Sequence, residues 1–267
     1  MEKDQPETVE RGERNAGDAM MRAPDYERGN VRLWCDDCLK LLPEIEAGSV
    51  DAVVTDPPFG IGWSRGTWND SEKDYPKLIK EVVIQSQRIV VNGWCFFFQG
   101  MPTCDKWRDW FPEGWRIFAA CKNFAQIRPT GIWHSWDPVI FWSNGKVPRL
   151  HDEATNRDWF VGNVAGLFGE NSEHPCPKPL DTMRNLVVIG APLNSLVIDP
   201  FLGSGSTILA CLQTKRSAMG IEIEPKYFEI ACRRVDEEFD KMALIDPTPP
   251  AKTRQLEFAK TPGTVAE

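Results

Sequence analysis

The sequence has no apolar run near the ~18 residues that a membrane-spanning helix needs, and it shows no secretory signal. Its eight cysteines are scattered, and Cys35-x-x-Cys38 has no second pair at zinc spacing. Several cysteines lie in apolar segments, as the reduced thiols of cytosolic proteins do. These absences predict a cytoplasmic protein that uses neither a membrane nor a metal.

The sequence also lacks an excess of positive charge. Its net charge is −8, so a nucleic-acid-binding function needs a local basic patch. Residues 100–150 are a candidate, because basic side chains alternate there with tryptophans, which suits phosphate contact and base stacking. The candidates for nucleic-acid contact in and beside this patch are Lys122, Arg128, Trp133, His134 and Arg149.

Strand-like and helix-like segments alternate between residues 30 and 245. Apolar runs predict strands at 31–34, 50–54, 94–98, 115–122, 139–142, 195–198 and 217–221. Helical spacing predicts helices at 38–45, 75–91, 101–111, 179–189, from 208 onwards, and at 227–242. This alternation predicts one doubly wound α/β domain with a mostly parallel sheet and helices on both faces. Composition predicts a disordered charged arm at 1–29, irregular structure at 148–174 and a disordered tail at 246–267.

One stretch has no folding purpose that its composition explains. Asp56-Pro57-Pro58-Phe59, called here the acidic corner (residues 56–59), follows the strand predicted at 50–54. Two successive prolines make a stiff, extended turn, because each fixes its own φ and disfavours helix before it. The turn holds a carboxylate, a backbone carbonyl and an aromatic ring together, which indicates a binding or catalytic site.

A second stretch, residues 199–207, joins a buried strand to a helix through Gly203 and Gly205. Such glycines let a backbone approach a ligand closely, and the helix start attracts anionic groups. Glu222 follows 19 residues after Gly203, at the end of the next predicted strand. An acid about 20 residues beyond a glycine turn is typical of ribose binding. The spacing is neither G-x-G-x-x-G nor G-K-[ST], and a structural turn with an incidental acid is the alternative.

Four motifs in order resemble those of DNA amino-methyltransferases. Residues 56–59 resemble the catalytic D-P-P-[YF], residues 174–179 resemble H-P-x-x-K-P, residues 199–207 resemble the cofactor motif D-P-F-x-G-S-G-[ST]-T, and residues 220–227 resemble G-I-E-x-x-x-x-Y. The catalytic motif precedes the cofactor motif, an order that resembles the beta group. The resemblance implies a Rossmann-like methyltransferase fold in permuted order, S-adenosylmethionine as methyl donor and DNA as substrate.

The resemblance also implies roles for residues. Asp56, Pro57, Pro58 and Phe59 would be catalytic. Cofactor binding would involve Asp36, Thr55, Lys178, Asp199, Phe201, Gly203, Ser204, Gly205, Ser206, Thr207 and Glu222. For Asp36 helix capping is an alternative, for Lys178 support of its own loop, and for Phe201 plain packing. Arg65 and Trp68, in the loop after the acidic corner, would close over a base flipped out of the duplex.

We expect methyl transfer to the N6 amino group of adenine in DNA, because the first motif residue is Asp and not Ser. The resemblance and the small size of the chain lead us to expect a restriction-modification or solitary enzyme. Cytosine N4 methylation and a non-catalytic nucleic-acid-binding relative are the alternatives. The methyltransferase domain would span residues 30–245, with a small target-recognition segment at 143–173. A homodimer is a further expectation.

Overall fold

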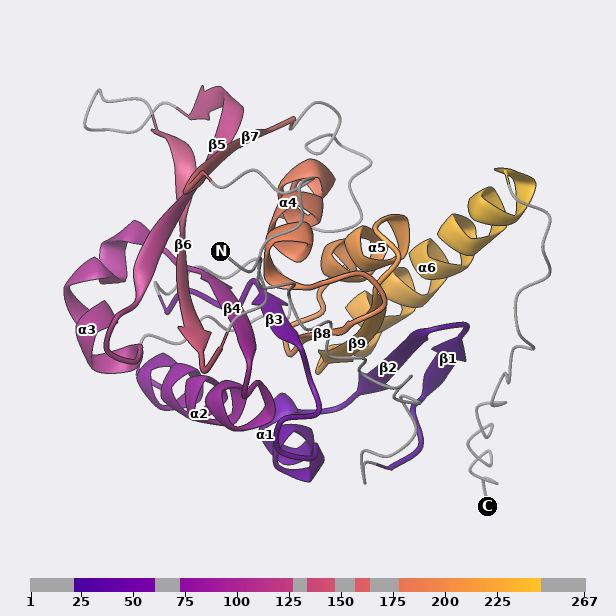
Figure 1. Ribbon diagram of the computed structural model, residues 1–267, viewed down its shortest axis with the longest axis horizontal. Coiled ribbons are helices and arrows are strands. Elements are labelled where there is room, and N and C mark those ends of the chain that lie inside the picture. Colours follow the sequence, from indigo (N-terminus) through magenta and orange to yellow (C-terminus); the bar gives the residue numbers. More distant parts are fainter. Residues whose placement is uncertain (1–21, 61–72, 127–133, 147–156, 164–177, 246–267) are drawn as a thin grey trace, which may run out of the picture.

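The computed structural model of the protein describes residues 22–60, 73–126, 134–146, 157–163 and 178–245. Its strands join in one nine-stranded sheet in the order β1-β2-β9-β8-β3-β4-β6-β5-β7 (Figure 1). The strands are β1 (Tyr26–Arg28), β2 (Val31–Cys35), β3 (Ala52–Thr55), β4 (Gly93–Phe98), β5 (Arg116–Gln126), β6 (His134–Asn144), β7 (Trp159–Gly162), β8 (Leu196–Asp199) and β9 (Ser217–Glu222).

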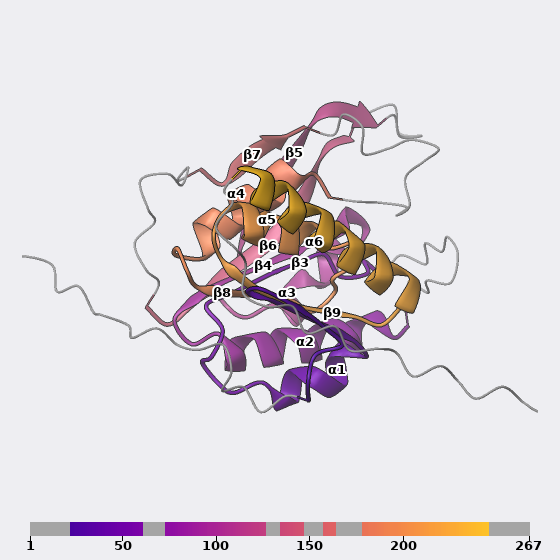
Figure 2. The ribbon, with the colours of Figure 1, turned by 90° about the vertical axis from the view of Figure 1, so that its right-hand side faces the viewer.

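Helices cover both faces of this sheet, as Figure 2 shows. On one face lie α4 (Leu180–Gly190), α5 (Ser206–Gln213) and α6 (Pro225–Ile245). On the other lie α1 (Cys38–Leu41), the 3-10 helix η1 (Leu42–Glu44), α2 (Tyr75–Ile89), the 3-10 helix η2 (Met101–Lys106) and α3 (Trp107–Trp110). The predicted doubly wound α/β architecture is confirmed.

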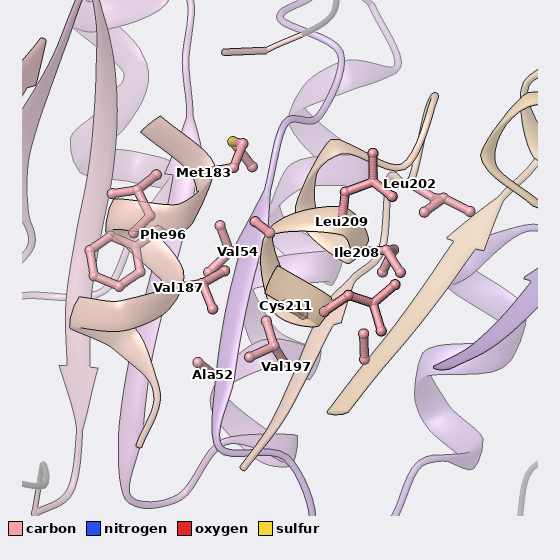
Figure 3. Packing of buried hydrophobic residues seen from close by; sticks show 14 of the residues in the cluster. Ala52, Val54, Phe96, Met183, Val187, Val197, Leu202, Ile208, Leu209 and Cys211 are labelled. Atoms are coloured by element: carbon pink, nitrogen blue, oxygen red, sulfur yellow. The ribbon is translucent and has the colours of Figure 1, made fainter. Parts of the chain in front are cut away.

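The continuous apolar character of the central strands follows from this layering. Successive strand residues point to opposite faces, so a strand covered on both sides needs apolar side chains throughout. Val54 and Phe96 pack beneath α4 and α5, whereas Val53 packs with the helices of the opposite face. Figure 3 shows Val54 and Phe96 beside Val187 of α4.

The sheet changes character across its width. From β2 to β4 all neighbouring strands are parallel, so their carboxyl ends meet at one edge. Beyond β4 the strand β6 is antiparallel to both β4 and β5, and β7 is parallel to β5. Both motif stretches follow strands of the parallel part, which places the candidate site at their shared edge. Such an edge is where open α/β sheets bind ligands.

The prediction of a disordered arm at residues 1–29 is wrong for the last residues of that range. Tyr26–Arg28 form β1, which pairs with β2. The Arg28 guanidinium contacts Asp236 and Asp240 of α6 at 2.7 Å each. These acids lie one turn apart on α6, and Arg28 is 208 residues from Asp236, so composition alone did not reveal the pairing.

Two further expectations need correction. The stretch predicted to be irregular contains β7, whose residues Trp159–Gly162 are held by pairing with β5. The single helix expected at 101–111 is a 3-10 segment, Met101–Lys106, followed by the short helix Trp107–Trp110. In the part of the chain that the structure describes, no helix is both long and apolar enough to span a membrane.

Candidate active site

The two motif stretches meet at neighbouring strand ends. Strands β3 and β8 pair in parallel, with Ala52 opposite Val197 and Val53 opposite Ile198. At their carboxyl ends the hydroxyl of Thr55 donates to Oδ1 of Asp199 at 2.6 Å, a bond between residues 144 positions apart. The acidic corner and the glycine loop (residues 200–205) therefore share one edge of the sheet.

Asp199 organises this junction from within. Its side chain is 2% exposed. Oδ2 accepts from the Thr207 hydroxyl at 2.5 Å, and Oδ1 accepts from the backbone N–H of Phe201 at 3.0 Å as well as from Thr55. Burial raises the pKa of Asp199 to about 6, against the effect of these hydrogen bonds. Three residues predicted for cofactor binding, Asp199, Thr55 and Thr207, thus bind one another and join β3, β8 and α5.

The glycine loop adopts backbone conformations that favour glycine. Gly203 has φ 53° and Gly205 has φ 84°, both in the left-handed region. Gly205 caps α5 without a side-chain bond, so Ser206 and Thr207 begin the helix and do not cap it. A Cβ on Gly205 would lie 3.2 Å from the Cβ of Ala231 in α6, so the loop packs closely on that helix.

Arg234 of α6 is a site residue that the sequence did not reveal. Its Nη1 donates to the carbonyl of Ser204 and, at 2.9 Å, to the Ser204 hydroxyl. Ser204 is therefore held from α6, and it is 5% exposed. The only local signal is a basic residue on a charged helix, which is too common to identify a contact with a loop 30 residues earlier.

Glu222 ends β9, the strand beside β8, and its carboxylate faces the glycine loop. Oε2 accepts from the N–H of Gly203 at 2.7 Å, and Oε1 accepts from the N–H of Glu224 at 2.9 Å. The side chain is 9% exposed, and burial raises its pKa to about 7. Glu222 and Gly203, which are 19 residues apart in the sequence, are therefore in direct contact.

Asp36 lies next along the same edge, because β2 pairs with β9 and Cys35 stands opposite Glu222. Its N–H donates to the carbonyl of Glu222 at 3.0 Å. The Asp36 carboxylate accepts from the N–H of Asp37 at 2.7 Å and from Lys40 at 3.1 Å, and these bonds lower its pKa. The capping role considered for Asp36 belongs to Asp37, which caps α1.

The acidic corner follows β3 and holds its carboxylate against Lys178. The Lys178 ammonium contacts Oδ2 of Asp56 and lies 5.3 Å from the ring centre of Phe59 and 5.0 Å from that of Phe98. Oδ1 of Asp56 is buried and receives no hydrogen bond from any residue in the described part of the chain. Burial raises the pKa of Asp56, and the charge of Lys178 opposes that rise.

Phe59 packs closely against Gly100, two residues after the end of β4. A Cβ on Gly100 would lie 3.0 Å from the Cβ of Phe59 and 3.3 Å from its ring. Pro57 is buried, whereas Pro58 and Phe59 are half-buried. Phe201 packs against the core on the face of the sheet that α1, α2 and α3 cover, and its N–H donates to Asp199. Packing therefore accounts for its position.

Lys122 was predicted to contact DNA, and the structure places it in an ion pair. Its ammonium lies 2.8 Å from Oδ2 of Asp137 on the neighbouring strand, and the side chains are 12% and 19% exposed. Both charges act on the pKa of Asp56, in opposite directions. The pair therefore belongs to the surroundings of the acidic corner.

The other predicted DNA-contacting residues are not placed here. Arg65, Trp68, Arg128, Trp133 and Arg149 lie outside the described residues, as do residues 147–156 and 164–173 of the predicted recognition segment. His134 is the first residue of β6, and its side chain is outside the description.

The carboxylate of Glu222 leads to a prediction about pH. An acid whose folded pKa is raised keeps its proton in the folded state while the unfolded chain has lost it. Between pH 4.5 and about 7 its contribution to the free energy of unfolding therefore falls as pH rises. In urea titrations of the cofactor-free proteins, the free energy of unfolding of wild type minus that of Glu222→Gln should fall by about 3 kcal/mol across this range. A difference that stays constant with pH would contradict the raised pKa.

The site fits the methyl donor that the motif resemblance implies. S-adenosylmethionine carries a ribose diol that can donate hydrogen bonds. Each carboxylate oxygen of Glu222 accepts one backbone N–H, from Gly203 or Glu224, and keeps a second lone pair that could accept from the diol. Gly203 and Gly205 leave the backbone beside this carboxylate without side chains. When bound, the group would supply a methyl that its positive sulfur already activates.

The chain is similar in sequence and fold to known DNA methyltransferases. A sequence model described as DNA methylase, N6_N4_Mtase, matches residues 50–233. The Type II methyltransferase M.HpaI of Haemophilus parainfluenzae is 25% identical over 243 residues, covering 80% of this chain and 77% of that protein. The M1.HpyAVI–SAM complex aligns with a TM-score of 0.60 and 23% identity, over 77% of this chain and 99% of that one. The cytosine-N4-specific PvuII DNA methyltransferase aligns with a TM-score of 0.64 and 15% identity, over 83% and 95%.

The two solved structures support the fold, and the family model covers more than half of the sequence. The chain therefore belongs to the N6_N4_Mtase family of DNA methylases, which use S-adenosylmethionine.

Proposed function

We propose that this DNA methyltransferase transfers the methyl group to the N6 amino group of adenine in DNA. The observation that carries the proposal is the buried Oδ1 atom of Asp56, an acceptor to which no described residue donates. A buried acceptor without a donor costs about 1–3 kcal/mol, so its presence at a strand end beside the glycine loop indicates that a ligand supplies the donor.

An exocyclic amino group is such a donor. Its lone pair is delocalised into the base, which makes the nitrogen a poor nucleophile. Acceptance of one N–H by Asp56 and another by the Pro57 carbonyl would move the nitrogen towards tetrahedral geometry and direct its lone pair at the methyl group. Methyl transfer would form the N–C bond as the S–C bond breaks, which would leave the sulfur neutral, and the nitrogen would then lose its proton to solvent. Because the methyl is already activated, positioning is the main demand on the protein.

The half-buried ring of Phe59 supports the delivery of a flipped base. It stands beside Asp56 at the edge of the sheet and offers a surface for stacking, which enzymes acting on bases use after extruding the nucleotide. Adenine is favoured over cytosine because the motif begins with Asp56, where the resemblance relates Ser to cytosine N4. Contact with the duplex is expected from Arg65, Trp68, Arg128, Trp133, His134 and Arg149.

Product analysis tests the assignment. The protein is incubated with isotopically labelled S-adenosylmethionine and DNA free of methylated bases, and the DNA is digested to nucleosides for mass spectrometry. We expect label in N6-methyladenine. Label in N4-methylcytosine would show that the target base is cytosine and not adenine. Cofactor binding by calorimetry without any methylated nucleoside would favour a non-catalytic relative. Sequencing of DNA from cells that express the chain then reports the target context.

A further inference from the structure

The two carboxylate oxygens of Asp56 have different surroundings. Oδ2 contacts the ammonium of Lys178, which precedes α4, whereas Oδ1 is buried and receives no bond from the described residues. The Lys178 side chain is 8% exposed and lies about 5 Å from the ring centres of Phe59 and Phe98. A charged side chain so placed holds one rotamer of the carboxylate.

We propose that Lys178 is a positioning residue for methyl transfer: by holding Oδ2 of Asp56, it orients Oδ1 to accept the target amino group. This inference rests on the proposed amino-group methylation, and it holds for either base. It is an alternative to the sequence-based expectation that Lys178 binds the cofactor.

The charges around Asp56 explain why Lys178 matters. Burial disfavours the ionised carboxylate. Asp199 of β8 and Asp137 of β6 repel it, and Lys122 of β5 attracts it but is paired with Asp137. Lys178 is the cation that contacts the carboxylate directly, and it is the largest favourable influence on its ionisation. The pKa of Asp56 should therefore rise when this charge is removed.

The test compares Lys178→Met, which keeps the length of the side chain, with Lys178→Arg, which keeps the charge. We expect Lys178→Met to lower kcat about 100-fold, the usual scale for losing an electrostatic or proton-handling group. Activity needs ionised Asp56, so the rising limb of the pH profile should move to higher pH. Lys178→Arg should retain most of kcat and the wild-type profile. Lys241→Met, an exposed substitution on α6, is the matched control and should change neither.

Two readouts do not depend on turnover. In the cofactor-free protein, carbon-13 NMR of Asp56 should show a higher pKa in Lys178→Met than in wild type. Calorimetry should show unchanged affinity for S-adenosylmethionine. Weakened cofactor affinity with an unchanged pH profile would overturn the proposal in favour of cofactor binding by Lys178. If Lys178→Met does not fold, Lys178→Gln, which keeps a hydrogen-bond donor without the charge, takes its place with the same expectations for pH.

The outcomes also separate this proposal from the proposed function. The product made by wild type decides the target base independently of any Lys178 variant. Full activity of Lys178→Met at every pH, on whichever base wild type modifies, would overturn the positioning role alone. Absence of any product from wild type would overturn the proposed function, and the NMR titration would still decide the electrostatic role of Lys178.

Discussion

Asp56→Ala is expected to lower methyl incorporation by about 100- to 1,000-fold, the scale on which a positioned electrostatic group contributes to catalysis. The variant loses the acceptor that orients the amino group, while the glycine loop and Glu222, held by β8, β9 and α6, keep their contacts. Affinity for S-adenosylmethionine should therefore change little. Label transfer to DNA and calorimetry with the cofactor measure the two quantities separately.

Loss of folding must be separated from loss of catalysis in this variant. Asp56→Ala leaves the Lys178 side chain, which is 8% exposed, without its carboxylate. The Asp56 side chain is 25% exposed, so the loss should cost less than the roughly 3–5 kcal/mol of breaking a fully buried pair from one side. The double variant Asp56→Ala/Lys178→Met removes both charges, so it should recover stability in thermal unfolding but not activity. Methyl incorporation at the wild-type rate in either variant would show that Asp56 is not catalytic.

Asp199→Ala is expected to destabilise the protein by roughly 2–4 kcal/mol and to reduce methyl transfer as well. The substitution removes the acceptor for the buried hydroxyls of Thr55 and Thr207 and for the N–H of Phe201. Thr55 directly precedes Asp56, so the acidic corner loses its bond to the strand that leads into the glycine loop. Urea unfolding and the KM for S-adenosylmethionine measure the two effects.

The opposite end of the same two strands supplies a matched control. Oδ2 of Asp51 accepts from the N–H of Leu196 at 2.8 Å, so it also joins β3 to β8, but at the edge away from the site. Asp51→Ala should destabilise the protein without a comparable rise in KM. Asp199→Asn, which keeps the shape and an acceptor oxygen, should be milder than Asp199→Ala. Equal effects of Asp51→Ala and Asp199→Ala on KM would contradict the linking role of Asp199.

Local patterns predicted much of the site because each part follows a strand end. The apolar run before Asp56, the glycines after Asp199 and the acid at Glu222 are legible without knowing the neighbours. Parallel strands place their carboxyl ends at one edge, so the meeting of these parts follows from the fold class. Edge elements such as β1 and β7 were missed, because pairing with neighbours and not their own composition stabilises them.

The sequence by itself determined the strand ends, the stiff turn at Asp56, the glycine turn at 203 and 205, and the fold class that unites them. Only the tertiary structure decided which polar groups pair: Thr55 with Asp199, Arg234 with Ser204, Lys122 with Asp137, and Lys178 with Asp56. The physical reason is range. Periodicity and turn chemistry are set by neighbours in the chain, whereas a buried charge takes the partner that folding brings within hydrogen-bonding distance. For Lys178 and Asp56 that partner is 122 residues away.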